Sequence, residues 1–177
     1  MRFARSPRRS FVASLGLIGA VTSLAVMFAA VRASAMMISW NNASGGNWGT
    51  PGNWNPAQVP GASDDAVITL AGTYTVTLDV AGTLNSLTLG GASGTQSLAI
   101  TGNTLTLAAA STVNANGVIN LSNGTFTGNG VLTVNGTFNW TGGTMSGSGT
   151  TEIAPTATLT ISSPVRLSMP TTAERSA

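Results

Sequence analysis

The sequence contains no histidine, no cysteine and no lysine, and only 7% of its residues are charged. The absence of cysteine excludes a disulfide framework and a thiolate-bound metal site. Without histidine, lysine or cysteine, the candidates for a general base are reduced to isolated carboxylates. We therefore expect no catalytic activity, no cofactor and no metal ion.

Positive charge is concentrated at one end of the chain. Five of the seven arginines precede residue 36. The two later arginines stand against five acidic residues, so residues 36–177 carry a net charge of −3. Binding to nucleic acid requires a basic face on the folded domain. The chain therefore shows no sign of a nucleic-acid partner.

Residues 1–35 have the three parts of a bacterial signal peptide. A basic stretch ends in Arg8-Arg9, and an uncharged run covers residues 11–31. Ala33-Ser34-Ala35 then supplies small residues at the two positions that a signal peptidase reads. The uncharged run is also long enough to span a bilayer, so an uncleaved membrane anchor is the alternative. On either interpretation the protein is expected to be secreted or held at the cell surface.

The route of export is left open by the basic stretch. Residues 7–12 resemble a twin-arginine signal, with two arginines, a spacer, Phe11 and an apolar residue. Pro7 and Ala13 depart from that pattern. The general secretory route is therefore kept as an alternative.

A repeat of about 19 residues follows Thr101 and brings apolar residues into shared columns. The columns are Ile100–Ile119–Phe138, Leu107–Phe126–Met145, Leu121–Trp140–Leu159 and Val113–Leu132. A fixed period of this size is typical of a solenoid, in which each repeat forms one coil. Short alternating runs between Gly, Asn and Ser predict about three strands per coil. We therefore predict an all-β fold, a right-handed parallel β-helix (β-solenoid) with about 19 residues per coil.

The same pattern predicts the boundaries of the segments. Alternation begins near Tyr74 and stops after Ser163, so residues 73–163 are predicted to form the solenoid. An insertion near residues 90–94 explains why the earlier part of this segment is out of phase. Residues 164–177 lack the pattern and are interpreted as a disordered tail or the end of a truncated chain. Residues 36–72 hold three of the four tryptophans and are predicted to be a Trp-rich N-terminal cap.

The order of motifs in residues 36–72 resembles the start of many secreted bacterial repeat proteins. The order is Trp40, a Gly/Asn loop, Trp48, Asn53-Trp54, Val59-Pro60 and Asp64-Asp65, followed by a strand. Families that are similar in this respect include autotransporter-like passenger proteins and proteins with PEP-type sorting tails. The resemblance implies an extracellular β-solenoid, and it implies no particular reaction.

Trp40, Trp48 and Trp54 are the candidate binding residues. Exposed aromatic rings could form a platform on which sugar rings stack. Alternatively, they close the end of the solenoid, because terminal coils must be capped. We favour the cap, since an exposed Trp cluster promotes aggregation unless it is bound.

Two further groups of residues have less specific interpretations. Asp64 and Asp65 are adjacent acids that could contribute to a Ca²⁺ site, but Ca²⁺ needs six to eight oxygen ligands, and Asp is common in turns. An outward column of Thr106, Thr125 and Thr144 could order water and bind ice. Ice-binding arrays use paired Thr columns, whereas the companion column here is Ala108, Thr127 and Ser146. We interpret both groups as structural.

Together these features predict an exported structural or adhesive scaffold of the cell surface or extracellular matrix. The alternative is a carbohydrate-binding module that uses the Trp cluster. The expected partners are extracellular polysaccharide or another copy of the chain, because an uncapped solenoid end exposes strand edges for end-to-end stacking. Contact with a membrane is expected only through an uncleaved leader.

Overall fold

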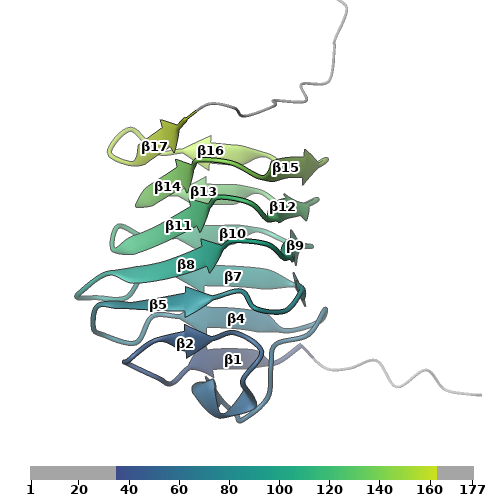
Figure 1. Cartoon of the computed structure of the whole chain (residues 1–177), viewed down its shortest axis with the longest axis vertical. Helices are drawn as coiled ribbons and strands as arrows, with labels where there is room; N and C mark the ends of the chain where they lie inside the picture. Colours follow the sequence, from purple (N-terminus) through teal and green to yellow (C-terminus); the bar gives the residue numbers. More distant parts are fainter. Residues whose placement is uncertain (1–34, 163–177) are drawn as a thin grey trace, which may run out of the picture. The chain divides into compact units, whose positions relative to one another are not determined.

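The computed structural model describes residues 35–162, and these residues are all-β (Figure 1). The predicted signal peptide (residues 1–35) and tail (residues 164–177) lie outside the described residues, apart from Ala35. Within the described range, no helix is long and apolar enough to cross a membrane.

The strands form three sheets, here called A, B and C. Sheet A contains, in spatial order, β16 (Thr151–Ile153), β13 (Leu132–Val134), β10 (Ser111–Val113), β7 (Ser86–Leu89), β4 (Asp65–Ile68), β1 (Met37–Trp40) and β3 (Trp54–Asn55). Sheet B contains β17 (Thr158–Ile161), β14 (Thr137–Trp140), β11 (Gly117–Leu121), β8 (Gln96–Ile100), β5 (Tyr74–Thr77) and β2 (Gly46–Asn47). Sheet C contains β15 (Thr144–Gly147), β12 (Thr125–Gly128), β9 (Thr104–Leu107) and β6 (Gly82–Leu84). A short 3-10 turn, η1 (Pro51–Asn53), precedes β3.

From β4 onward, successive strands belong to sheet A, then B, then C, and this order repeats. Strands β7, β8 and β9 form one coil, and β10, β11 and β12 form the next, with parallel pairing between them. The result is a β-solenoid of about 5 turns, which confirms the predicted fold class. A single coil cannot bury its apolar face alone, so stacked neighbours are what stabilise it.

The coil is longer than the predicted repeat, at about 21 residues per turn. Thr104 pairs with Thr125, and Thr125 pairs with Thr144, so the later of these two coils is the shorter by two residues. The difference arises at the corner between sheets A and B. Val113 pairs with Val134 before this corner and Val118 with Thr137 after it, so the corner is two residues shorter in the later coil.

The predicted columns are therefore correct only where the chain passes through the shorter coil. The observed columns are Leu98–Ile119–Phe138–Leu159 and Ile100–Leu121–Trp140–Ile161 in sheet B, Leu105–Phe126–Met145 in sheet C, and Ser111–Leu132–Thr151 with Val113–Val134–Ile153 in sheet A. The pairs Ile119–Phe138 and Phe126–Met145 are as predicted. Leu107, expected next to Phe126, pairs with Gly128 instead.

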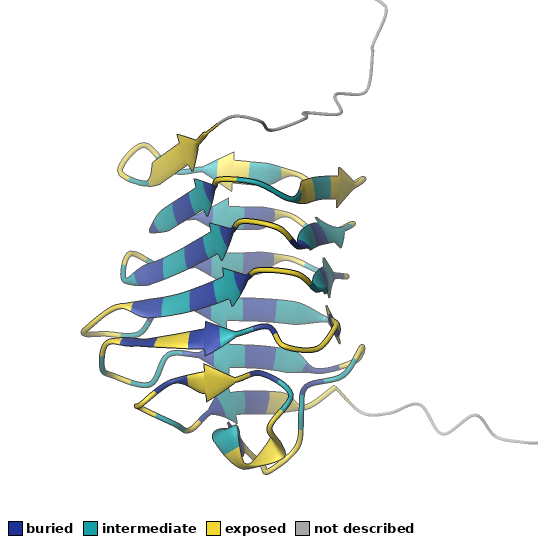
Figure 2. Cartoon of the chain, viewed as in Figure 1, coloured by how far each residue is buried: buried dark blue, intermediate teal, exposed yellow. Residues whose placement is uncertain are grey.

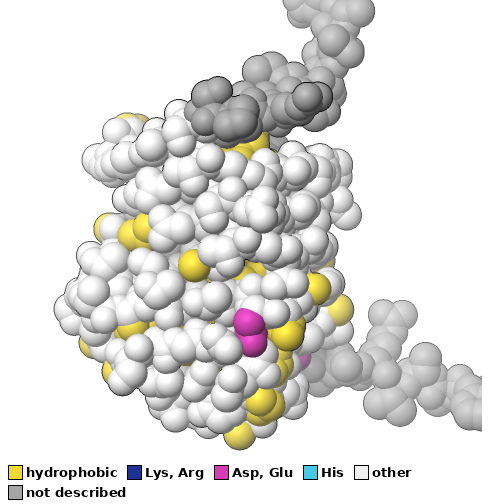
Figure 3. Space-filling view, in the orientation of Figure 1, with side chains coloured by type: hydrophobic (Ala, Val, Ile, Leu, Met, Phe, Trp, Pro, Cys, Tyr) yellow, Lys and Arg dark blue, Asp and Glu magenta, His cyan; other side chains and the backbone are white. Residues whose placement is uncertain are grey.

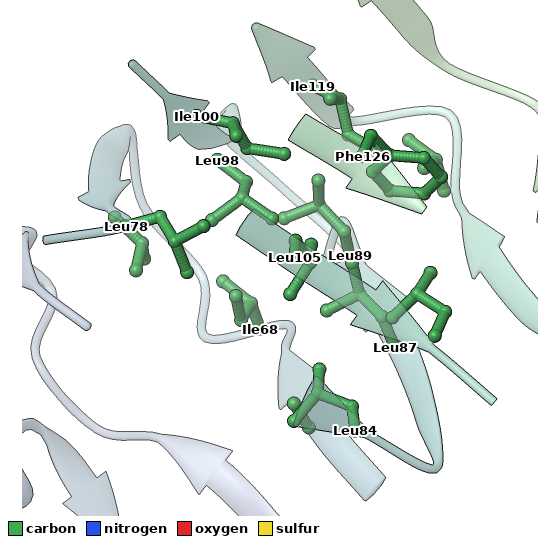
Figure 4. Packing of buried hydrophobic residues seen from close by; sticks show 14 of the residues in the cluster. Ile68, Leu78, Leu84, Leu87, Leu89, Leu98, Ile100, Leu105, Ile119 and Phe126 are labelled. Atoms are coloured by element: carbon green, nitrogen blue, oxygen red, sulfur yellow. The ribbon is translucent and has the colours of Figure 1, made fainter. Parts of the chain in front are cut away.

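Inward-facing side chains of the three sheets form one hydrophobic core. Strands β8 and β11 of the middle coils alternate between buried and partly exposed residues, as the period of two requires (Figure 2). Leu78 follows β5, Leu98 and Ile100 lie on β8, and Leu105 lies on β9, and all four point into the same interior (Figure 4). Burial of such side chains is the main favourable contribution to the stability of the stack.

The two ends of the stack differ. At the N-terminal end, β3 pairs antiparallel with β1 and covers the edge of sheet A. Strands β1 and β4 in sheet A and β2 in sheet B already belong to the coils, so the segment 36–72 combines capping residues with coil strands. At the other end, Leu159 and Ile161 of β17 remain 42% and 46% exposed although they occupy inward columns.

Candidate functional site

The aromatic residues of the N-terminal end form a packed cluster. Trp40 meets Trp54 edge to face with ring centroids 5.0 Å apart, and Trp48 meets Trp54 similarly at 4.7 Å. Tyr74 stacks on Trp40 with centroids 6.5 Å apart. Two of the indoles donate to backbone oxygens: Trp54 Nε1 to Trp48 at 2.7 Å and Trp40 Nε1 to Asn42 at 2.6 Å.

These rings lie in the core and not on a surface. Trp40, Trp48 and Trp54 are 2%, 0% and 2% exposed. A carbohydrate platform needs an accessible ring face, and none of these three rings presents one in the described residues, so their burial favours the cap over the platform. Their burial is what the capping role predicts, because the rings fill the N-terminal end of the solenoid's core.

The three aspartates of the described residues have structural partners. Asp64 Oδ2 accepts from Gly61 N at 2.9 Å within a turn, and Asp79 Oδ1 accepts from Gly49 N at 2.7 Å. Asp65 Oδ1 accepts from Asn85 Nδ2 at 2.8 Å and from Ser86 Oγ at 2.6 Å in the next coil. Glu152 is exposed on β16.

In residues 35–162, no group of three or more His, Cys, Asp or Glu side chains could hold a metal ion. Asp64 and Asp65 lie on a turn and at the first position of β4, and their hydrogen bonds run to different parts of the chain. The structural interpretation of this pair therefore accounts for the contacts that both carboxylates make.

Sequence reasoning did not identify Gln96, which is fully buried at the start of β8. Its Oε1 accepts from Gly91 N at 2.6 Å, and its Nε2 donates to the backbone oxygens of Gly72 and Ser93. The side chain thus joins the loop of its own coil to the loop of the coil before it. The loop of its own coil, between β7 and β8, contains residues 90–94, where the sequence predicts an insertion.

The threonine columns of sheet C differ from the prediction because of the two-residue shift in register. Thr104, Thr125 and Thr144 form one outward column, and Thr83, Thr106, Thr127 and Ser146 form the neighbouring one. The column beside that of Thr125 therefore consists of hydroxyl residues, and Ala108 is not part of it. Neighbouring columns lie about 6.8 Å apart along the strands and successive coils about 4.8 Å apart.

Two hollows lie in the last coils. A hollow of about 410 Å³ opens where sheet C turns into sheet A, with Phe126 and Trp140 in its floor and Thr127, Ser146 and Ser148 among its polar lining. A smaller one of about 170 Å³ lies at the open end, among Trp140, Ile153 and Ile161. The face in Figure 3 consists mostly of uncharged polar side chains and backbone, with few charges.

Comparisons with known proteins do not add a family. No protein-family model, no curated protein and no solved structure matches the chain. A function must therefore be argued from the residues and geometry of the chain itself.

Proposed function

We propose that the chain is an exported, non-catalytic scaffold of the cell surface or extracellular matrix, with a structural or adhesive role. The observation that carries this proposal is the stack of coils in residues 35–162, with buried tryptophans filling one end and exposed apolar side chains of the last described strand at the other. Outward positions are mostly Thr, Ser and Asn, which suit a long hydrated surface. Asp64, Asp65 and Asp79, which could have supplied chemistry, accept hydrogen bonds within the fold.

Export is supported by the sequence of residues 1–35, with its basic start, uncharged run and Ala33-Ser34-Ala35. The test is the location of the full chain, tagged after Ala177 and produced in a bacterial host. We expect a tagged protein outside the cytoplasm that protease can reach in intact or osmotically opened cells. Retention of a full-length precursor in the cytoplasm would contradict the proposal.

The route of export has its own matched variants. Arg8→Lys with Arg9→Lys keeps the charge but removes the arginine pair, so it should block a twin-arginine route. Arg2→Lys with Arg5→Lys keeps the pair and serves as the control. Normal export of the first double variant would assign the chain to the general secretory route and leave the scaffold proposal intact.

The partner that the open end favours is a second copy of this chain. Leu159 and Ile161 of β17 present exposed apolar side chains there. The outer edges of the last strands, β15, β16 and β17, pair with no other strand among residues 35–162. At the opposite end β3 covers the edge of sheet A and the buried tryptophans fill the interior, so the open end of one copy would find no matching apolar surface on the N-terminal end of another. Contact of two open ends forms a closed, two-fold dimer and not a fibre.

Sedimentation of the exported protein tests this contact. We expect a dimer that dissociates in the double variant Leu159→Glu with Ile161→Glu. The control is Thr158→Glu with Thr160→Glu, which places the same charges on the outward face of the same strand. A monomeric wild-type protein that binds polysaccharide would favour the carbohydrate-binding alternative, and the hollow floored by Phe126 and Trp140 would then be the surface to mutate.

A second candidate function follows from the paired hydroxyl columns of sheet C. Three coils present two hydroxyl residues side by side at regular spacing. The 19-residue repeat in the sequence aligns Ala108 with Thr127 and therefore does not predict two adjacent hydroxyl columns. Such an array could order water and bind ice. Inhibition of ice recrystallisation by the purified protein, lost in Thr125→Leu with Thr127→Leu but kept in Thr137→Leu of sheet B, would support it; no inhibition by the wild type would exclude it.

A further inference from the structure

The backbone of Met36 is held at both of its polar atoms. Its N–H donates to Asp64 Oδ1 at 3.2 Å, and its oxygen accepts from Asp65 N at 2.8 Å. The second oxygen of Asp64 accepts from Gly61 N at 2.9 Å, so both carboxylate oxygens are engaged. Strand β1 follows immediately, although the side chain of Met36 is exposed like that of Ala35.

This start of the fold coincides with the end of the predicted signal peptide. Ala33-Ser34-Ala35 places the cleaved bond between Ala35 and Met36. Among the described residues, Met36 is the first whose backbone is hydrogen-bonded to the neighbouring strand β4. Cleavage at this bond would therefore leave every strand of the solenoid intact and place the new amino terminus beside Asp64.

The charges around this position make the new terminus distinctive. Residues 35–162 contain four carboxylates and no basic side chain. Asp64 is only 8% exposed. A carboxylate in such a position is stabilised more by a charged donor than by a neutral one. Among the described residues, only a free amino terminus could supply that positive charge.

We propose that removal of the signal peptide creates an ion pair between the α-ammonium of Met36 and the carboxylate of Asp64, and that this pair fixes the first strand of the solenoid. This inference rests on the proposed export. A signal peptidase hydrolyses the Ala35–Met36 bond with one water molecule: Ala35 gains a carboxylate, and the nitrogen of Met36 becomes a primary amine. An α-amine has an ordinary pKa of about 8, so it takes up a proton at neutral pH.

Around Asp64, the precursor and the mature chain then differ in the chemical state of the Met36 nitrogen. In the precursor the Met36 nitrogen is a neutral amide with one N–H directed at Asp64. In the mature chain the same nitrogen carries a positive charge beside the same carboxylate. The N-terminal strand, and with it the cap that β3 forms on β1, is therefore expected to be more stable after export than before it.

The absence of lysine makes this testable on the exported protein itself. With no lysine in the sequence, the amino terminus is the only primary amine of the chain. Acetylation removes its charge but keeps one N–H, as in the precursor. Reductive dimethylation also leaves one N–H but keeps the charge. The two products therefore form a matched pair that differs in charge at the Met36 nitrogen.

Mass spectrometry of the exported protein should first show a chain that begins at Met36. The acetylated form should then melt lower than the dimethylated form, by on the order of 3 °C. This difference should vanish in Asp64→Asn and persist in Asp65→Asn, whose carboxylate bonds to Asn85 and Ser86 instead. Equal melting temperatures of the two modified wild-type forms, or the same difference in Asp64→Asn, would overturn the ion pair.

The outcomes separate this inference from the proposed function. An exported protein with a different amino terminus would contradict the ion pair and leave export standing. A chain that is never exported would contradict the proposed function. In that case a chain whose translation starts at Met36 still allows the acetylated and dimethylated forms to be compared.

Discussion

The indole Nε1 of Trp54 donates to the backbone oxygen of Trp48 at 2.7 Å, and the two rings meet edge to face with centroids 4.7 Å apart. This contact joins the antiparallel strand β3 to the loop that follows β2. Because both rings are buried, the closed end of the solenoid depends on their packing. Edge-to-face aromatic pairs add more to the stability of a fold than their buried area alone accounts for.

Replacement of Trp54 by alanine should therefore lower the free energy of unfolding by about 3–5 kcal/mol. That is a large fraction of a typical total of about 5–15 kcal/mol. Trp54→Phe keeps an aromatic ring but loses the hydrogen bond, and it should fall between the wild type and Trp54→Ala. Denaturant titrations measure the order of the three proteins.

Tryptophan fluorescence gives an independent check of the closed end. With four tryptophans at most 4% exposed, the emission of the native protein should be blue-shifted and only weakly quenched by iodide. Strong quenching, together with a spectral shift on addition of polysaccharide, would instead favour the carbohydrate platform.

Phe126 and Thr125 test the direction of side chains in sheet C. Phe126 is 6% exposed between Leu105 and Met145, whereas Thr125 faces outward. Phe126→Asp buries a charge with no partner and should abolish cooperative folding. Thr125→Asp should melt close to the wild type. Equal losses in circular-dichroism melts would contradict the inward and outward assignment.

The sequence predicts the faces of the strands better than their register. Alternation within a strand is local, so the inward positions of Ile119, Phe126 and Phe138 are predictable from a few neighbouring residues. Register depends on the length of each corner. The corner after Val113 has two residues more than the corner after Val134, and no hydrophobic pattern marks that difference. A period taken from the shorter coil therefore shifts the columns by two residues in the longer one.

The contacts of the candidate site could not be predicted for a similar reason. The hydrogen bond from Met36 to Asp64 joins residues 28 apart in sequence, and that of Gln96 with Gly72 joins residues 24 apart. Neither pair has a motif, because each depends on which loops the stacking brings together. By contrast, the burial of the tryptophans follows from the general need to cap a solenoid.

Two glycines at equivalent corners between sheets B and C should respond differently to alanine. Gly143 has a φ of +75°, and a Cβ there would collide with the backbone oxygen of Gly124 in the preceding coil. Gly102 has open space around the position of a Cβ. Gly143→Ala should cost at least about 1–3 kcal/mol, whereas Gly102→Ala should be neutral or slightly stabilising. Thermal melts of the two variants decide, and a tolerated Gly143→Ala would show that the corner can shift.

Tyr74 makes the closed end sensitive to alkaline pH. Its side chain is 5% exposed, and its hydroxyl makes no hydrogen bond of ordinary geometry among the described residues, although the backbone of Leu70 lies close enough to lower its pKa in part. Burial raises the pKa of Tyr74 from 10.0 to about 12, because desolvation disfavours the phenolate. Between these two values the unfolded chain releases a proton that the folded chain retains. The contribution of protonated Tyr74 to the free energy of unfolding is therefore fully present below pH 10 and is lost as the pH rises towards 12.

This titration can be followed at a single residue, because Tyr74 is the only tyrosine in the sequence. Tyrosinate absorbance of the native protein should rise near pH 12, and that of the denatured protein near pH 10. Tyr74→Phe removes a buried hydroxyl that makes no hydrogen bond of ordinary geometry, so at neutral pH it should be as stable as the wild type or more stable. It should also lose less stability between pH 10 and 12. Native absorbance that rises near pH 10 would show that the ring is accessible to water and that the closed end opens.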